Sequence, residues 1–185
     1  MRICKICIAL FLLLLPLESI AAEEAQIADL VITNTSENLL VYFKVEKSFT
    51  KDIEEAILAG IPTTFTFVLE LRRERHYWFD EKESFLEVEH TIKYDNVKKV
   101  FYVAFTEEGR SPQQFKDFAE AKIAMSELNG IVFTTLRQLM RGNKYYLRVK
   151  AKLEEVRLPL HLEYVFFFVS LWDFETDWFV QDFVY

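Results

Sequence analysis

Three histidines are the residues with the most obvious capacity for chemistry. His76, His90 and His161 lie far apart in the sequence, and no HxH or HExxH spacing brings two of them together. Metal sites depend on such spacing, because their ligands must converge on one ion. The sequence therefore predicts no metal site. His90 falls on the apolar side of an alternating stretch, so we expect a core histidine with one hydrogen-bonded ring nitrogen.

The carboxylates and serines give no catalytic pattern either. Glu87 and Glu89 share one face of a predicted strand, a spacing that glycoside hydrolysis can use, but alternating charges of this kind far more often form a solvated face. No serine lies in a GxSxG turn, and the four glycines of the chain form no phosphate-binding loop. We predict no catalytic residue and no cofactor, which favours a protein that is not an enzyme.

A cluster suited to binding lies at the end of a predicted strand. It combines arginines with consecutive aromatic residues: Arg72, Arg73, Arg75, Tyr77, Trp78 and Phe79. Arginine and aromatic side chains are the types enriched at the energetic centres of protein interfaces. The alternative is an exposed strand end whose arginines pair with Glu70 and Glu74. We treat the cluster as a candidate interaction surface.

The C-terminal stretch is the second candidate surface. Ten residues between Tyr164 and Tyr185 are aromatic, and three consecutive phenylalanines put rings on both faces of any strand. Either both faces are buried, or one apolar face is exposed and marks a contact surface. Core, protein contact and lipid contact all remain open, as do a strand and a short helix. The candidate residues are Tyr164, Phe166, Phe167, Phe168 and Trp172.

The scaffold that positions these residues has the two-residue period of β-strands. Residues 28–32 and 39–45 flank a turn-forming segment and predict a hairpin. Residues 63–72 alternate between apolar and polar types, which predicts a long strand with one exposed face. Residues 86–94 and 101–105 alternate in the same way and predict a second hairpin.

Two short helices are predicted within this β-rich chain. Thr50 is placed to cap a helix over residues 51–59, which Gly60 ends. A second helix is predicted to begin at Ser111, because proline follows the serine and a glutamine closes a capping box. It would end at Gly130, and its buried face would consist of Phe115, Phe118, Ala119 and Ile123.

A tyrosine near the end of the chain gives the most informative fold signal. Tyr145 follows Gly142 by three residues and opens an alternating stretch that runs to Leu153. This arrangement resembles the tyrosine corner of immunoglobulin and fibronectin type III sandwiches, in which the tyrosine bonds back to upstream backbone. We therefore expect a mainly β (α+β) fold, an immunoglobulin/fibronectin-III-like β-sandwich with two inserted helices. The strand order stays open.

The first 22 residues have the order of a secretory signal peptide. Arg2 and Lys5 precede an apolar run over residues 6–15, and small residues follow, so cleavage is expected after Ala21 or Ala22. The apolar run is too short for a stable membrane anchor. The sequence therefore predicts an exported protein, in the periplasm or the cell envelope, with no stable transmembrane span after cleavage.

Cysteine content and charge exclude further classes. Cys4 and Cys7 both lie in the predicted signal peptide, so the mature chain would have no disulfide and no cysteine-based zinc site. The formal charge of the chain is −7, and loss of two cations and one anion with the signal peptide gives −8. An acidic protein is a poor ligand for nucleic acid, so no nucleic-acid partner is expected.

Four stretches of the chain resemble one known family. They are FTKDIEEAILAGIPTTFTFVLEL, HTIKYDNVKKVF, KIAMSELNG and LPLHLEYVFFFVSLWDFETDWF. They are similar to a family of exported bacterial proteins known as domain of unknown function 4390, over essentially the whole mature chain. The resemblance implies bacterial origin, export and one compact domain. It assigns no activity and no functional residue.

Together these observations predict a signal peptide over residues 1–22 and a single β-sandwich-like domain over residues 23–185. The expected function is that of an exported, non-catalytic envelope protein that acts as a protein-interaction module, with an unidentified envelope protein as its partner. The alternative is a periplasmic carrier that encloses an apolar ligand or lipid.

Overall fold

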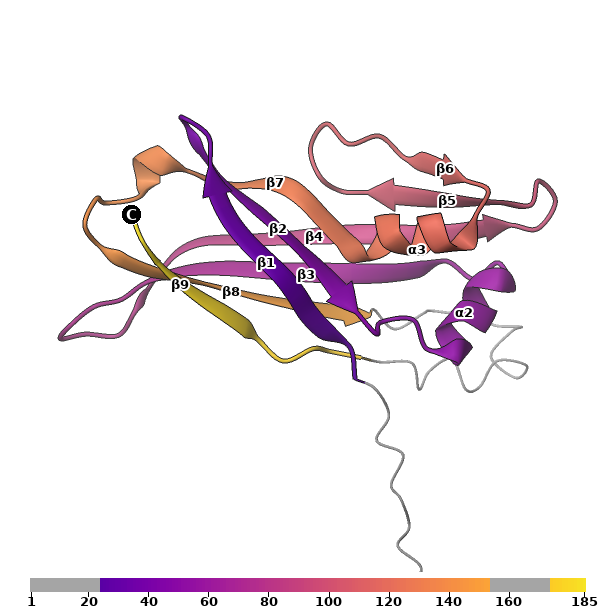
Figure 1. Cartoon of the computed structure of the whole chain (residues 1–185), viewed down its shortest axis with the longest axis horizontal. Coiled ribbons are helices and arrows are strands. Elements are labelled where there is room, and N and C mark those ends of the chain that lie inside the picture. Colours follow the sequence, from indigo (N-terminus) through magenta and orange to yellow (C-terminus); the bar gives the residue numbers. More distant parts are fainter. Residues whose placement is uncertain (1–23, 154–173) are drawn as a thin grey trace, which may run out of the picture.

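The computed structural model describes residues 24–153 and 174–185. Within them, antiparallel strands form two sheets (Figure 1). One sheet has the order β1 (Gln26–Asn34), β2 (Asn38–Glu46), β7 (Glu127–Thr135). The other has the order β6 (Gln113–Phe115), β5 (Val100–Phe105), β4 (Glu81–Asp95), β3 (Thr63–Arg73), β8 (Lys144–Leu153), β9 (Phe179–Val184). The predicted mainly β sandwich with two helices is confirmed.

Both predicted hairpins and the first predicted helix are present. β1 pairs with β2, and β4 pairs with β5, in antiparallel register. Helix α2 (Lys51–Leu58) begins after Thr50, whose side chain accepts a bond from the N–H of Ile53. Gly60, just past the helix, has a φ of +87°, which a residue with a Cβ rarely adopts. A 3₁₀ turn, η1 (Leu136–Gln138), links β7 to the loop before β8.

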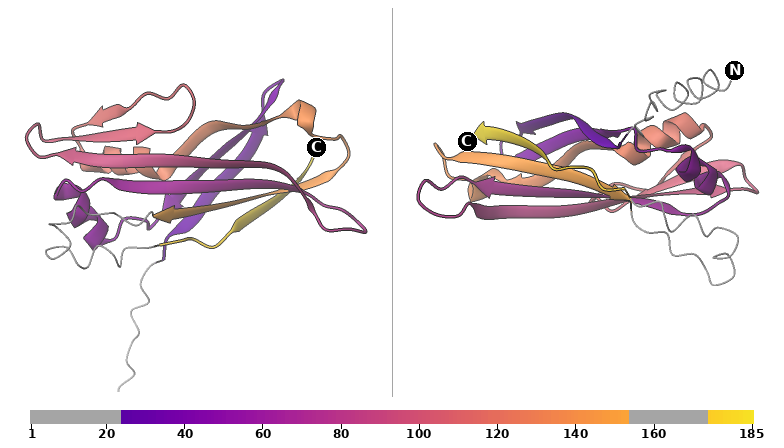
Figure 2. Two further views of the ribbon diagram at one scale, coloured as in Figure 1. Left: turned by 180° about the vertical axis from the view of Figure 1, so that it is seen from behind. Right: turned by 90° about the horizontal axis from the view of Figure 1, so that it is seen from below.

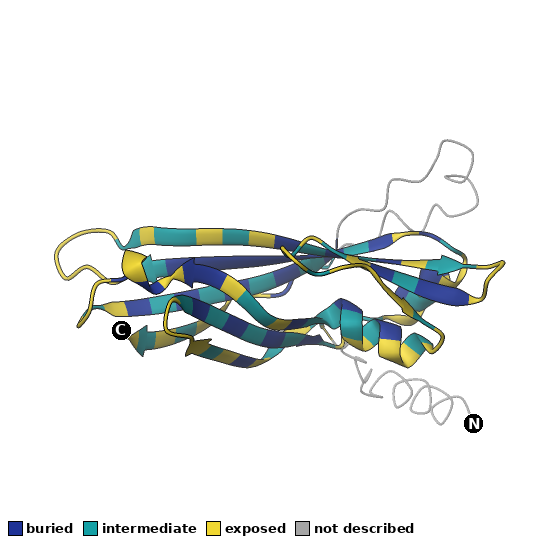
Figure 3. Ribbon diagram, turned by 90° about the horizontal axis from the view of Figure 1, so that it is seen from above, coloured by how far each residue is buried: buried dark blue, intermediate teal, exposed yellow. Residues whose placement is uncertain are grey.

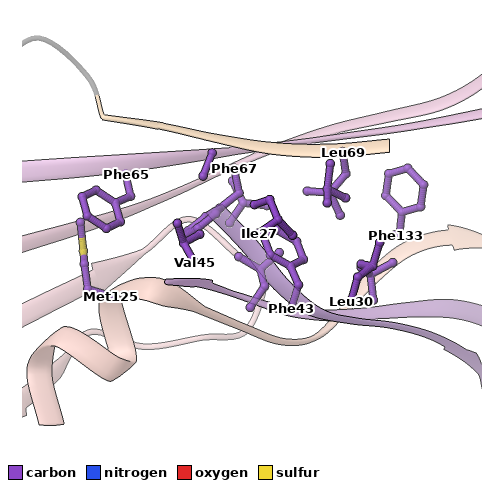
Figure 4. Packing of buried hydrophobic residues seen from close by; sticks show 14 of the residues in the cluster. Ile27, Leu30, Phe43, Val45, Phe65, Phe67, Leu69, Met125 and Phe133 are labelled. Atoms are coloured by element: carbon purple, nitrogen blue, oxygen red, sulfur yellow. The ribbon is translucent and has the colours of Figure 1, made fainter. Parts of the chain in front are cut away.

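The core fills the space between the two sheets (Figure 4). Alternate residues of β2 point inward, and Phe43 packs edge-on against Phe67 of β3 at 5.7 Å between ring centroids. Ile27 of β1 and Phe133 of β7 extend the same cluster, and Leu69 joins it from β3. These side chains are the apolar members of the alternating patterns, so burial of one strand face accounts for the sandwich.

Strand β3 differs from its prediction. The expected exposed face is buried at Thr66, Val68 and Glu70, as well as the expected core face. The reason is its central place in the sheet, because β4 and β8 flank it and Arg148 of β8 lies over Glu70. Alternation in the sequence identifies the core face of a strand, but not whether neighbours cover the other face.

The second helix begins later than predicted. Residues 113–115 form strand β6, which pairs with β5, and helix α3 (Phe118–Ser126) starts after Asp117. Its buried residues are Ala121 and Met125, whereas the predicted Ala119 and Ile123 are exposed. Phe115 and Phe118 are partly buried, the former from the strand. Proline thus precedes an edge strand, where its missing N–H costs no ladder bond.

The molecule is elongated, with the helices at one end (Figures 1 and 2). The turn between β3 and β4 lies at the opposite end, where the exposed residues form a loop beyond the sheets (Figure 3). Neither described helix has the length and apolarity that a membrane crossing requires. The predicted signal peptide lies outside the described residues.

Candidate interaction surface at the end of the β3–β4 hairpin

Three aromatic side chains stand exposed at the end of the β3–β4 hairpin. Tyr77 is 92% exposed, Trp78 74% and Phe79 87%. Their contacts are with each other and with a neighbour, since His76 packs edge-on against Tyr77 and Trp78 edge-on against Phe79. We call Tyr77, Trp78 and Phe79 the aromatic tip. Three consecutive large rings in water are unusual for a folded chain, whose apolar surface is normally dispersed.

Ion pairs hold the two strands together below the aromatic tip. Arg73 pairs with Glu81 and, at 2.9 Å, with Glu83, and Arg75 also pairs with Glu81. Arg73 and Glu83 are mostly buried, so these charges sit against the protein rather than in bulk water. Register explains the contact, because Arg73 lies directly opposite Glu81 in the β3–β4 ladder.

The carboxylate of Asp80, the residue just before β4, holds the turn in place. Asp80 accepts a bond from the backbone N–H of Arg75 at 3.2 Å and another from the hydroxyl of Tyr146 at 2.9 Å. Burial, followed by this bond to Asp80, raises the pKa of Tyr146. The N–H of Glu74 donates to the carbonyl of Lys144 at 3.0 Å. Strand β8, the other neighbour of β3, therefore also holds the end of the hairpin in place.

Arg72 is partly exposed, but it is paired with a buried carboxylate. Its Nε donates to Glu70 at 2.6 Å, and Arg148 donates to the other oxygen of Glu70 at 2.7 Å. Burial alone would raise the pKa of Glu70, but the two guanidinium groups outweigh it and hold that pKa below its ordinary value. Arg72 thus forms a charge network with Glu70 and Arg148 on the outer face of the sheet.

The structure divides the predicted cluster into two groups. The aromatic residues are exposed, whereas all three arginines face carboxylates. Of the two ion pairs in the alternative interpretation, the one with Glu70 is present, at Arg72, whereas Glu74 lies 4.0 Å from Lys144. Sequence reasoning missed Glu81 and Glu83, which alternate on the returning strand. Folding the hairpin about residues 74–80 places Glu81 opposite Arg73, with Glu83 two residues further along the same strand, and this spacing was the available signal.

The second candidate surface, in the C-terminal stretch, cannot be placed next to the first one. Tyr164, Phe166, Phe167, Phe168 and Trp172 lie outside the described residues. Just beyond them, Phe174 packs edge-on against Phe65 at 5.3 Å and joins the core. The guanidinium of Arg148 and the ammonium of Lys150 lie over the ring of Trp178, at 4.4 and 4.8 Å from its centroid.

His90 is a core residue, but both of its ring nitrogens have partners. Nδ1 lies 3.0 Å from the carbonyl oxygen of Met125, and Nε2 lies 2.7 Å from Glu107. The prediction of one bonded nitrogen was wrong, because the loop after β5 brings Glu107 over the end of the sheet. Within residues 24–153 and 174–185, no group of three or more acidic, histidine or cysteine side chains converges as a metal site would require.

A groove of about 700 Å³ opens beside the start of β1. Its lining mixes apolar side chains with charged ones, among them Glu24, Lys47, Glu175 and Asp177. Sites for apolar ligands are lined mainly by hydrophobic and aromatic side chains. The lining of this groove is therefore mixed rather than mainly apolar.

One comparison with known proteins gives a family. The family model for a domain of unknown function, DUF4390, matches residues 22–182. No curated protein and no solved structure matches the chain. The match covers both sheets and the β3–β4 hairpin and extends almost to the end of β9. The chain belongs to the DUF4390 family.

Proposed function

We propose that this protein is an exported, non-catalytic protein of the bacterial cell envelope, in the periplasm or at the envelope surface, that binds another protein through its aromatic tip. The order of charged, apolar and small residues over positions 1–22 supports export. The observation that carries the proposed binding is the exposure of Tyr77, Trp78 and Phe79 on a braced hairpin.

The ordered support of the aromatic tip matters because a flexible surface loses conformational entropy on binding. A mobile loop loses conformational freedom when a partner orders it, and that loss reduces affinity. Here Arg73, Arg75 and Asp80 tie the two strands together immediately below the rings. The aromatic tip is therefore presented on a support that is already ordered, and aromatic side chains add large contact area with few rotatable bonds.

Charge favours a protein partner over an anionic membrane surface. Membrane-binding segments usually carry clusters of free lysine or arginine that attract anionic lipid. The two arginines nearest the aromatic tip, Arg73 and Arg75, both pair with Glu81, Arg73 also pairs with Glu83, and the whole chain is acidic. A partner with an apolar pocket for one or two rings fits this surface, since aromatic anchors in desolvated pockets dominate protein interfaces.

The proposal is tested by crosslinking in cells that express the full-length gene. A photo-crosslinking amino acid replaces Trp78, and the protein captured on irradiation is identified and purified. Its affinity is then measured with wild type and with Trp78→Ser. We expect the substitution to weaken binding by about tenfold or more, as loss of an aromatic anchor does, with an unchanged thermal unfolding midpoint.

Val97 provides the matched control. It is 93% exposed and lies in the β4–β5 turn, at the far end of the sheet from the aromatic tip (Figure 1). Val97→Ser should leave affinity unchanged, and a crosslinker at Val97 should not capture the same protein. Equal capture from both positions would refute the proposal. Trp78-dependent sedimentation with phosphatidylglycerol vesicles, without any protein crosslink, would replace the protein partner with a lipid surface.

A further inference from the structure

Within the described residues, strand β9 forms one edge of the larger sheet. It pairs with β8 on one side and ends the strand order of the larger sheet on the other (Figures 1 and 2). Phe179, Val180 and Val184 are exposed along it. Edge strands display unpaired N–H and C=O groups and invite another strand unless the chain protects them.

The other three edges of the two sheets carry such protection. β1 has a bulge between Ala28 and Val31, with Asp29 in the left-handed region at φ 53°. β6 is only three residues long. The pairing of β7 shifts register twice along β2. β9 pairs without a shift over six residues, and it contains no proline, glycine, lysine or arginine. It is therefore the edge best formed for strand addition.

The backbone alternation of β9 determines which groups face outward. The N–H of Tyr185 donates to the carbonyl of Asn143, its partner in the extended register. Hydrogen-bonded and non-hydrogen-bonded pairs alternate in antiparallel ladders, so Phe183, Gln181 and Phe179 also bond toward β8. The N–H and C=O groups of Val180, Asp182 and Val184 consequently point away from the sheet.

We propose that β9 pairs antiparallel with β9 of a second copy of this chain, about a two-fold axis at Gln181. In such a pair, a residue whose N–H and C=O groups point toward the second copy must lie opposite another residue of that kind. Residues of that kind alternate along the strand, so the two-fold axis must pass through a residue and not between two residues. An axis at Asp182 would oppose two carboxylates, which is destabilising. An axis at Gln181 instead opposes two amides and places Asp182 opposite Val180 of the second copy.

Side chains on both faces of the strand fit this register. Phe183 stacks on Tyr145 at 5.8 Å between centroids, so it lies on the core side, and Phe179 shares that side by alternation. The Gln181 axis places Phe179 opposite Phe183 of the second copy, an aromatic cross-strand pair that continues the core across the axis. On the other side, Val184 of the second copy extends past the start of β9 toward Trp178, whose ring lies under Arg148 and Lys150.

The register is tested by disulfide formation in protein expressed from the full-length gene. Gln181 would face Gln181 of the second copy in a non-hydrogen-bonded pair, whose Cα separation of about 4.5 Å suits a disulfide. We expect Gln181→Cys to give mainly crosslinked dimer under mild oxidation on a non-reducing gel. Val184→Cys is the matched control, because the two positions would lie about 20 Å apart. The wild-type chain reports any contribution of Cys4 and Cys7.

A second variant tests the backbone contacts without a thiol. The N–H of Val180 points outward, so Val180→Pro removes a bond to the second copy but none to β8. Sedimentation should show a dimer for wild type and a monomer for Val180→Pro, with similar unfolding midpoints. The proposal is overturned if wild type is monomeric at millimolar concentration, if Val184→Cys crosslinks as well as Gln181→Cys, or if Asp182→Cys crosslinks better.

Discussion

The hydroxyl of Tyr145 accepts a hydrogen bond from the backbone N–H of Met140 at 2.8 Å. The ring is almost completely buried at the start of β8, and the bond ties the loop over residues 139–143 to the core. This is the tyrosine corner that the sequence predicted, with the tyrosine bonding back five residues along the chain. The same ring supports Phe183 of β9. One side chain thus joins the loop, the core and the edge strand.

Tyr145→Phe should destabilise the protein by about 1 kcal/mol, because the N–H of Met140 loses its partner while the packing of the ring is kept. Urea unfolding followed by tryptophan fluorescence measures the difference. Tyr102→Phe is the control, since the Tyr102 hydroxyl is exposed and its contact with Lys98 is long, at 3.4 Å. An equal effect of both substitutions would show that the Tyr145 bond contributes nothing particular.

The buried pair of His90 and Glu107 gives a second prediction. His90→Phe should cost about 2–3 kcal/mol, because Glu107 keeps its burial and loses the bond that compensates it. The cost should be partly recovered in the double variant His90→Phe/Glu107→Leu, in which no carboxylate is left without its imidazole partner. Arg110, the other partner of Glu107, is partly exposed and can turn to water.

The measurement is a double-mutant cycle of unfolding free energies at pH 7. The four proteins should give a coupling energy of about 1–3 kcal/mol, as for residues in direct contact. Additive effects would mean that the 2.7 Å contact between His90 and Glu107 does not stabilise the fold.

The buried carboxylate of Glu70 should make the folding stability of the protein depend on pH in the acid range. Its pKa is held below the ordinary value of 4.5 in the folded protein, since the bonds from Arg148 and Arg72 outweigh the effect of burial. A carboxyl group with a lowered folded pKa stabilises the fold above its unfolded pKa, and this contribution is lost as pH falls through the folded pKa. The Glu70 contribution should therefore be complete above about pH 5.5 and should decline below pH 4.5.

Glu70→Gln should cost about 2 kcal/mol at pH 7 and less at pH 2, because the contribution of the wild-type charge is lost as the pH falls through the folded pKa of Glu70. Chemical unfolding across this pH range measures the two curves. Glu37→Gln, at an exposed turn position, should run parallel to wild type. If the Glu70→Gln and wild-type curves stayed equally far apart at both pH values, the network around Glu70 would not be the source of the acid sensitivity.

The sequence was most informative where local chemistry decides the structure. The hairpin of β1 and β2, the cap at Thr50 and the corner at Tyr145 are all set by residues close together in the chain, and each was predicted correctly. Features set by distant partners were missed. Glu70 is buried under Arg148, which belongs to another strand and pairs with it. His90 has a second hydrogen bond because the loop after β5 brings Glu107 next to its ring. The arginines of the hairpin end likewise needed the register before their partners could be named.

The second helix shows how two local signals compete. Ser111 and Pro112 have the pattern of a helix start, but Asp117 offers a stronger acceptor six residues later. Residues 113–115 gain ladder bonds with β5 when they extend as a strand, and Phe101 then stacks on Phe118 at the helix start. The capping pattern alone carries no information about a strand that is available to pair with.

The competing helix starts can be separated by substitution. The side chain of Asp117 accepts bonds from the N–H groups of Ala119 and Glu120, at 2.7 and 3.1 Å. Asp117→Ala should therefore cost about 1 kcal/mol, the usual value of a helix N-cap, partly through the lost attraction between the carboxylate and the helix dipole. Ser111→Ala should change the unfolding free energy by less than about 0.5 kcal/mol, because Ser111 lies on an exposed loop before β6.

Guanidinium unfolding of both variants makes the comparison, and Asp117→Asn should restore most of the loss, since asparagine caps about as well. A larger effect at Ser111 than at Asp117 would return the helix start to the position that the capping pattern indicated.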